Sequence, residues 1–323
     1  MKMQNEENPM LQRNLVADVG GTNIRLAIAC QSKLNHIQTF KCAEFPSLEA
    51  AIKHYIEFNQ LNIEKACICI AGAVNDEIIK MTNLDWQFSA HSLEQYCQIK
   101  QVHLINDYHA IAMSLPQLSS KQLITISDKK AQTQAPKMVC GPGTGLGIAQ
   151  LISVGKHHHC ISGEGGHIAF APTSKQQIQV LNHLLDQHER VSIERLLSGQ
   201  GIINIYQALA VQSNVIAQPY DAQHITEHFI HKTDELCIRS IELFLEILAQ
   251  FLGDLVLMNG AFGGVYIAGG ILPRIIEHID FTQFKQHYTH KGRFTGYVNQ
   301  APLYLITEPQ PGLIGAAAYL EQV

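Results

Sequence analysis

The chain has 323 residues, of which 46% are hydrophobic and 16% are charged, and its formal net charge is -5. This length is sufficient for two domains of ordinary size, and the apolar share excludes a disordered protein. An acidic balance without a long basic run makes nucleic acid and anionic membranes poor partners. We therefore expect a globular enzyme with no nucleic-acid and no membrane partner.

Eight cysteines are scattered along the chain without a Cys-x-x-Cys pair. Most of them, such as Cys67, lie inside apolar runs, which indicates buried thiols in a reducing compartment and not a disulfide framework. The first thirteen residues are polar and predict a loose tail without a secretory signal. The most apolar stretch, 241–258, is interrupted by Glu242, Glu246 and Asp254, which indicates a core helix. These features predict a cytoplasmic protein.

In the first third of the chain, short apolar runs alternate with helical patterns. The expected strands are, in order, 15–19, 24–30, a segment around Thr39, 66–71 and 102–105. Ser47 is expected to cap a helix over 48–58, and a second helix is expected over 108–114. This alternation predicts a mostly parallel sheet covered by helices.

The polar stretch 119–137 is expected to cross into a second domain. Beyond it, 138–140 and 146–153 repeat the opening pattern of strand, glycine turn and strand, which indicates two similar lobes. Helices dominate 175–259, and the longest is expected over about 233–258. The last expected elements are strands at 265–268 and 303–307 and a helix at 313–320.

A turn with an acid, two glycines, a hydroxyl and an amide joins the first two expected strands, Asp18-Val19-Gly20-Gly21-Thr22-Asn23. Glycine permits a backbone with positive φ, and successive N–H groups in such a turn can form an anion-binding nest. Asp18 would repel a bare phosphate, so its presence implies a bridging cation, for which Mg²⁺ fits best. The alternative is an ordinary Gly-Gly hairpin turn.

Two further glycine turns follow expected strands. The first has four glycines in the seven residues from Gly141 to Gly147; it is neither a P-loop nor a dinucleotide fingerprint. We interpret it as a phosphate loop, with a flexible turn as the alternative. In the second, Gly269 and Gly270 would let a nucleotide base or ribose pack closely against the backbone.

Asn106 and Asp107 lie at the end of an expected strand, where open α/β sheets place catalytic groups. Asp107 can accept a proton from a substrate hydroxyl while Asn106 holds a neighbouring hydroxyl. The alternative is that Asp107 caps the helix that begins near Tyr108.

Three further side chains can hold a small polar ligand. Glu164 and His167 lie three residues apart on a glycine-rich backbone, and both can face one ligand. Glu194 is expected in the first turn of a helix capped by Ser192. The cluster 157–160 offers three histidines and a cysteine, which we interpret as a solvated surface run and not as a metal site.

Together these segments resemble the bacterial ATP-dependent glucokinases of the hexokinase–actin–Hsp70 superfamily, in the family's order and over nearly the whole chain after residue 13. The matching stretches are Asp18–Arg25, Met81-Thr82-Asn83, Ile105-Asn106-Asp107, Gly141–Gly147, Gly163–His167, Val191–Gly199, Phe262–Gly270, Lys291-Gly292-Arg293-Phe294 and Pro311-Gly312-Leu313.

The resemblance implies a two-lobed, actin-like (RNase H-like) α/β fold with an active-site cleft between the lobes. A small domain would comprise 1–117 and 308–323, and a large domain with helical insertions would comprise 118–307. It also implies the transfer of phosphate from Mg-ATP to the 6-hydroxyl of D-glucose, the first step of glycolysis, and a homodimer. Two departures from the family are Ala17, in place of Gly, and Pro142, in place of a small residue. Pro142 removes one N–H donor from the second turn.

The resemblance also implies the role of each site residue. Asp107 would be the general base and a glucose ligand, and Asn106, Glu164, His167 and Glu194 would hold the other hydroxyls. Asp18 would lie near Mg²⁺, through water. The residues implied to bind ATP are Ala17, Asp18, Val19, Gly20, Gly21, Thr22, Asn23, Gly143, Thr144, Gly145, Gly269 and Gly270. The competing hypotheses are a kinase for mannose or an N-acetylhexosamine, and a non-catalytic sugar sensor or assembly protein.

Overall fold

The computed structural model describes residues 14–30, 33–72, 74, 77–81 and 84–323. The chain divides into two compact units, which we call unit 1 (Met1–Leu118 with Pro309–Val323) and unit 2 (Ser119–Glu308). The tail predicted over the first thirteen residues lies outside the described residues, as do Thr82 and Asn83 of the family resemblance.

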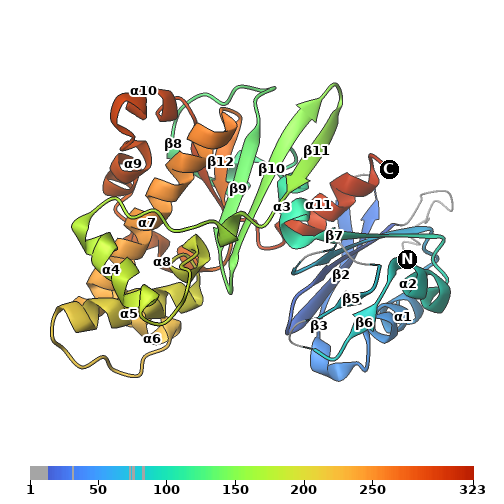
Figure 1. Ribbon diagram of the computed structural model, residues 1–323. Coiled ribbons are helices and arrows are strands. Elements are labelled where there is room, and N and C mark those ends of the chain that lie inside the picture. The colour runs from blue at the N-terminus through green and yellow to red at the C-terminus, as the bar shows by residue number, and fades with distance from the viewer. Residues whose placement is uncertain (1–13, 31–32, 73, 75–76, 82–83) are drawn as a thin grey trace, which may run out of the picture. The chain divides into compact units, whose positions relative to one another are not determined.

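Unit 1 is built on a five-stranded sheet in the order β3-β2-β1-β4-β7, of which Figure 1 labels β2, β3 and β7. Its strands are β1 (Asn14–Val19), β2 (Asn23–Cys30), β3 (Lys33–Lys41), β4 (Lys65–Ile70) and β7 (Gln101–Asn106). The first three strands form an antiparallel meander, and β1, β4 and β7 are parallel. A separate two-stranded sheet pairs β5 (Ile79–Lys80) with β6 (Gln87–Phe88).

Helices cover both faces of this sheet because side chains alternate along its strands. Leu15 and Ala17 pack in one core cluster, with α1 (Leu48–Phe58) and α2 (Ala90–Cys97), whereas Val16 packs in the other. That second cluster includes α3 (Asp107–Ser114) and α11 (Pro311–Leu320). Ser47 caps α1, because its side chain accepts the N–H of Ala50 at 3.2 Å. The predicted cap and helix are confirmed.

Unit 2 contains a six-stranded sheet in the order β11-β10-β9-β12-β13-β8. Its strands are β8 (Leu123–Ser127), β9 (Lys137–Pro142), β10 (Leu146–Val154), β11 (His157–Ser162), β12 (Gly264–Ile267) and β13 (Leu303–Ile306). As in unit 1, an antiparallel meander, β9-β10-β11, comes first; β12 then pairs with β9 in parallel, and β13 pairs with β12 in parallel. The repeat of strand, glycine turn and strand predicted from the sequence is confirmed.

β8 corrects the expectation that 119–137 is only a polar crossing. The short run Leu123–Ser127 pairs antiparallel with β13 and forms an edge of the sheet. An edge strand buries few of its side chains, here Ile126 and Ser127. The sequence of this strand is therefore hard to distinguish from the polar residues on either side of it.

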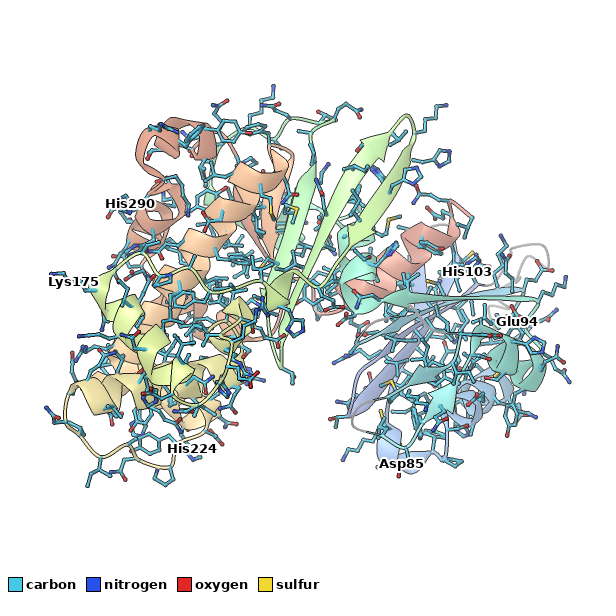
Figure 2. The ribbon with its side chains drawn as sticks, viewed as in Figure 1. Asp85, Glu94, His103, Lys175, His224 and His290 are labelled. Carbon is cyan, nitrogen blue, oxygen red and sulfur yellow. The ribbon has the colours of Figure 1, made fainter. Side chains whose placement is uncertain are left out.

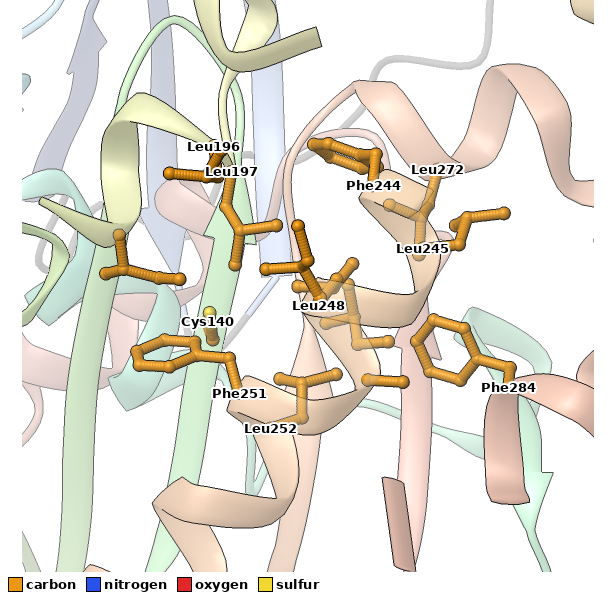
Figure 3. Packing of buried hydrophobic residues seen from close by; sticks show 14 of the residues in the cluster. Cys140, Leu196, Leu197, Phe244, Leu245, Leu248, Phe251, Leu252, Leu272 and Phe284 are labelled. Atoms are coloured by element: carbon orange, nitrogen blue, oxygen red, sulfur yellow. The ribbon is translucent and has the colours of Figure 1, made fainter. Parts of the chain in front are cut away.

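The helices of unit 2 surround one large core. They are α4 (Lys175–Leu185), α5 (Gly199–Gln212), α6 (Ala222–His231), α7 (Glu235–Asn259), α8 (Ile271–Ile275), α9 (Phe281–Thr289) and α10 (Thr295–Val298). The 25-residue α7 is the long core helix predicted over about 233–258. Figure 3 shows Leu248 and Phe251 of α7 beside Leu196 and Leu197, which precede α5.

Polar side chains lie on the outside of unit 2, as Figure 2 shows for Lys175, His224 and His290. One exception is Lys291, whose side chain is only 8% exposed. Its Nζ donates to the carbonyl of Gln250 at 2.7 Å and to Oδ1 of Asp254 at 2.6 Å. This matched family segment therefore ties the end of α9 to α7. Within the described residues, no helix is both long and apolar enough to cross a membrane.

Candidate active site

The first glycine turn joins β1 to β2 and is held in place by Cys42. The N–H of Gly20 donates to the carbonyl of Asn23 at 3.0 Å, and the N–H of Cys42 donates to the carbonyl of Thr22 at 2.9 Å. The buried Cys42 thiol also donates to the carbonyl of Gly20 at 3.4 Å. Sequence reasoning missed this anchor, because two whole strands, β2 and β3, separate the turn from Cys42.

The backbone of this turn corrects one expectation. Neither Gly20 nor Gly21 has a positive φ, so the expected nest of alternating conformations does not form at these two residues. A Cβ added at Gly20 would meet only the carbonyl oxygen of Asn23, at 3.5 Å. Ala17 is fully buried within β1, as expected for strand geometry.

Asp18 lies near the end of β1 and pairs with a cation on the neighbouring strand. Its Oδ2 is 3.2 Å from Nη1 of Arg25, and the Asp18 side chain remains 26% exposed. Burial raises the pKa of Asp18, whereas the charge and hydrogen bond of Arg25 lower it. Gly312, at the start of α11, faces this carboxylate. A partly exposed carboxylate fits Mg²⁺, which takes one or two protein carboxylates together with substrate phosphates.

Asn106 and Asp107 lie where β7 ends and α3 begins. The cap of α3 is Asn106, whose Oδ1 accepts the N–H groups of Tyr108 at 2.9 Å and of His109 at 3.2 Å. Asn106 Nδ2 donates to the carbonyl of Gly72 at 2.9 Å. The alternative interpretation of Asp107 as the cap is therefore wrong, since Asp107 is the first residue of the helix.

The environment of Asp107 changes its acidity. Burial raises the pKa of Asp107 to about 6, and the negative charge of Asp18 adds to the rise, while hydrogen bonds from Tyr108 and Asn106 oppose it. A carboxyl with a pKa near 6 is mostly ionised at neutral pH and can still bind a proton well. These are the properties of a general base.

The second glycine turn joins β9 to β10 in unit 2. The N–H of Gly143 donates to the carbonyl of Gly145, and that of Gly199 donates to the carbonyl of Gly143, both at 2.8 Å. A Cβ added at Gly143 would meet nothing within 4 Å. Open space beside a glycine backbone lets a ligand approach closely. Gly270 is equally open.

Pro142 and Gly269 join this turn to the third one. Pro142 is the last residue of β9, and its carbonyl would overlap a Cβ at Gly269, which has a φ of +88°. Position 269 therefore requires glycine for two reasons, its backbone conformation and its close packing.

Glu164, His167 and Glu194 lie on two adjacent segments of unit 2. The N–H of Ile193 donates to the carbonyl of Ile168 at 2.9 Å, which places a 3₁₀ turn, Gly165–His167, beside a second one, Ile193–Arg195. His167 Nδ1 then lies 3.9 Å from Oε1 of Glu194. Glu164 precedes the first turn and is exposed.

The structure corrects the prediction that a helix begins at Glu194. The residues there form a 3₁₀ turn, and Ser192 makes no side-chain cap. The α-helix begins at Gly199, where Ser198 accepts the N–H of Gly201 at 3.0 Å. Leu196 and Leu197, which lie between the 3₁₀ turn and this helix, are fully buried. Their burial in the core separates the turn from the helix.

Glu194 also contacts the second glycine turn, which sequence reasoning did not anticipate. Its Oε2 accepts the N–H of Leu146 at 2.9 Å. A Cβ added at Gly145 would lie 2.6 Å from the same oxygen. The glycine turn and the two 3₁₀ turns therefore form one packed group within unit 2.

The comparison with known proteins shows the family to which the chain belongs. The family model described as glucokinase matches residues 15–323. A glucokinase from Colwellia psychrerythraea (strain 34H) is 45% identical over 318 residues, which cover 96% of each chain. The chain belongs to the glucokinase family.

Solved structures of glucokinases share the fold. The crystal structure of a glucokinase from an Antarctic psychrotroph has a TM-score of 0.89 at 34% identity, over 97% of this chain and 100% of that one. A ROK family glucokinase from Streptomyces griseus, solved with glucose and AMPPNP, has a TM-score of 0.61 at 17% identity, over 96% of this chain and 100% of that one. The predicted family and actin-like α/β fold are confirmed, as is the class of enzyme, a sugar kinase.

In this glucokinase family member, the site residues predicted from the sequence fall into two groups, one in each unit. Unit 1 carries Ala17, Asp18, Val19, Gly20, Gly21, Thr22, Asn23, Asn106 and Asp107. Unit 2 carries Gly143, Thr144, Gly145, Glu164, His167, Glu194, Gly269 and Gly270.

The histidine cluster 157–160 lies on the edge strand β11, which carries none of the predicted site residues. His157 and His159 are exposed, but His158 is half-buried, with Nδ1 3.2 Å from Oγ of Ser153. Among the residues that the structure describes, no group of three or more His, Cys, Asp or Glu side chains is arranged to hold a metal ion.

Proposed function

We propose that this glucokinase family member phosphorylates D-glucose at its 6-hydroxyl with Mg-ATP and releases ADP. The observation that carries the proposal is Asp107, a carboxyl with a pKa of about 6 at the carboxyl end of β7. Parallel sheets place catalytic groups at this end. The family membership supplies the reaction class.

In the proposed reaction, the glucose O6 oxygen forms a bond to the γ-phosphorus of ATP while the bond to the β,γ-bridging oxygen breaks. The O6 proton passes to the Asp107 carboxylate, and ADP leaves with the bond's electron pair. Phosphoryl transfer requires little covalent chemistry from the protein, so positioning and charge neutralisation are its main tasks.

Four further side chains would position the sugar: Asn106, Glu164, His167 and Glu194. An amide carries two N–H donors, and Asn106 uses one for Gly72. We propose that the second N–H binds a sugar hydroxyl. Carboxylates accept hydrogen bonds only, so Glu164 and Glu194 would each receive hydroxyl hydrogens. The exposed faces of Glu164 and His167 support this role.

The glycine turns would hold the nucleotide. Residues Ala17 to Asn23 in unit 1 and Gly143 to Gly145 in unit 2 would bind the phosphates, with backbone N–H groups other than those of Gly20 and Gly143, which bond within their own turns. Gly269 and Gly270 would lie near the adenosine. Asp18 would hold Mg²⁺ through water, and that ion would neutralise phosphate charge. The Streptomyces griseus structure with glucose and AMPPNP supports this ligand pair. The homodimer and the cytoplasmic location stay predictions from the resemblance and the composition.

The test is ADP release by the purified protein with Mg-ATP, with and without D-glucose, followed by a panel that includes mannose and N-acetylhexosamines. Glucose-dependent release with glucose 6-phosphate as the product is expected. Release with another hexose but not with glucose would change the substrate. Measurable ATP binding without release for any sugar would favour the sensor hypothesis.

A further inference from the structure

Glu194 lies between the sugar-binding and phosphate-binding residues that the proposed function assigns to unit 2. Its Oε2 accepts the N–H of Leu146 at 2.9 Å, and Leu146 directly follows the Gly143–Gly145 turn. Its Oε1 lies 3.9 Å from Nδ1 of His167, a proposed sugar ligand. One carboxylate therefore contacts both groups.

Leu146, the residue after the glycine turn, packs closely against the segments that carry Glu194 and His167. A Cβ at Gly145 would lie 2.6 Å from Oε2 of Glu194, and a Cβ at Gly166 would overlap the carbonyl of Leu146. Gly166 belongs to the 3₁₀ turn that carries His167. The sugar-side segments thus accept the N–H of Leu146 through Glu194 and pack closely against its carbonyl at Gly166.

The backbone of Glu194 is fixed, but its carboxylate is accessible. Ser198 Oγ donates to the carbonyl of Glu194 at 2.8 Å, and the adjoining Leu196 is fully buried. The Glu194 side chain is 30% exposed. A ligand can therefore reach the carboxylate without unfolding the turn. The main freedom left to Glu194 is the orientation of its side chain.

We propose that Glu194 is a positioning residue that couples sugar binding to nucleotide binding. A sugar hydroxyl bound to the carboxylate restrains it in the orientation that holds the Leu146 N–H. This restraint orders the Gly143–Gly145 turn before the phosphates arrive, so the second ligand pays a smaller ordering entropy. By linkage, glucose and nucleotide must tighten each other's binding by the same factor. This inference rests on the proposed function.

The experiment measures that coupling factor by calorimetry. The Kd of a magnesium-bound, non-hydrolysable ATP analogue is determined without glucose and at saturating glucose, and the ratio of the two values is the factor. For the wild type we expect about 5 or more, within the usual range of coupling. Glu194→Ala should reduce the factor to about 1 even when glucose is saturating.

Three further variants separate coupling from a structural role. Glu194→Gln keeps an oxygen that can accept the Leu146 N–H, so it should weaken glucose binding yet retain most of the factor. Gly145→Ala keeps the carboxylate but displaces it from Leu146, so it should lower the factor. Glu164→Ala is the matched control: its described contacts do not include the turn, so it should lose glucose affinity but keep the factor.

A purely structural role would change affinities or the Tm but leave the coupling factor as it is. A wild-type factor of 1, or the same factor in Glu194→Ala as in the wild type, would overturn the inference alone, provided that glucose is still phosphorylated. A wild type that neither binds nor phosphorylates glucose would overturn the proposed function, and this inference with it.

Discussion

Burial and the negative charge of Asp18 together raise the pKa of Asp107 to about 6. Asp18 lies in β1 and Asp107 begins α3. The fold of unit 1 places them so that the charge of Asp18 acts on the Asp107 carboxyl. Arg25, opposite Asp18 in the register of β1 and β2, offsets the charge of Asp18. The acidity of the proposed base is therefore set by the fold and not by its sequence neighbours alone.

The first prediction concerns the pH dependence of turnover. A general base must be ionised to accept the O6 proton, so kcat/KM for glucose should rise with pH through an apparent pKa of about 6 and then level off. Steady-state rates between about pH 5 and pH 8 measure this limb. If the rate instead falls only near pH 4, the ordinary range of an Asp, the pKa of Asp107 is not raised by burial.

The second prediction concerns stability. The pKa of Asp107 is about 6 in the folded chain against an ordinary value of 3.8, so between these values the folded state binds more protons than the unfolded state. The contribution of Asp107 to the stability of the wild type then falls as pH rises from about 4 to about 6 and stays lower above that range.

Asp107→Asn removes this titration while its amide oxygen can still accept the Tyr108 N–H. The Tm of the variant should exceed that of the wild type at about pH 8, and the difference should shrink towards about pH 4. Thermal unfolding at both values measures this. A difference that does not change with pH would contradict the raised pKa.

The third prediction tests the anchor of the first glycine turn. Cys42→Ala removes the hydrogen bond from the thiol to the carbonyl of Gly20. An ordinary hydrogen bond contributes about 0.5–1.5 kcal/mol and a thiol is a weaker donor, so the KM for Mg-ATP should rise by roughly 2-fold and by no more than about 10-fold. Cys42→Ser restores a donor and should recover part of the loss. An unchanged KM in the Ala variant would mean that the turn needs no anchor from Cys42.

The fourth prediction tests the packing of α3 on α11. An added Cβ at Gly315 would overlap the carbonyl of Ala110 in α3, so Gly315→Ala should destabilise the protein by about 1–3 kcal/mol. Gly296→Ala, in α10, is the control, because a Cβ there meets nothing within 4 Å. Denaturant unfolding compares the two. Equal stabilities would show that the helices separate at little cost.

Local patterns in the sequence predicted much of this fold. Ser47 capping α1, the long apolar α7 and the two strand–glycine turn–strand units all depend on residues close together in the chain. Each of the motifs that carry the proposed chemistry is likewise a short run of residues close together in the chain. These features could be recognised because propensity, capping and hydrophobic periodicity act over a few residues.

Contacts between distant segments could not be predicted in this way. The bond from Cys42 to Gly20 spans 22 residues, and the bond from Leu146 to Glu194 spans 48. Ser192 and Ser198 both precede helical segments, and the α-helix follows Ser198, after Leu196 and Leu197 have entered the tertiary core. The role of Asn106 as cap, with Asp107 inside the helix, likewise depends on backbone geometry and not on residue type.

The most direct test of the proposed mechanism compares turnover and glucose affinity in Asp107→Asn. The amide cannot accept the O6 proton, so kcat should fall by about 10²–10⁴, whereas the Kd for glucose measured by calorimetry should change far less. This pair of results would assign Asp107 as the general base of glucose phosphorylation. An Asn variant that phosphorylates glucose at the wild-type rate would contradict the account.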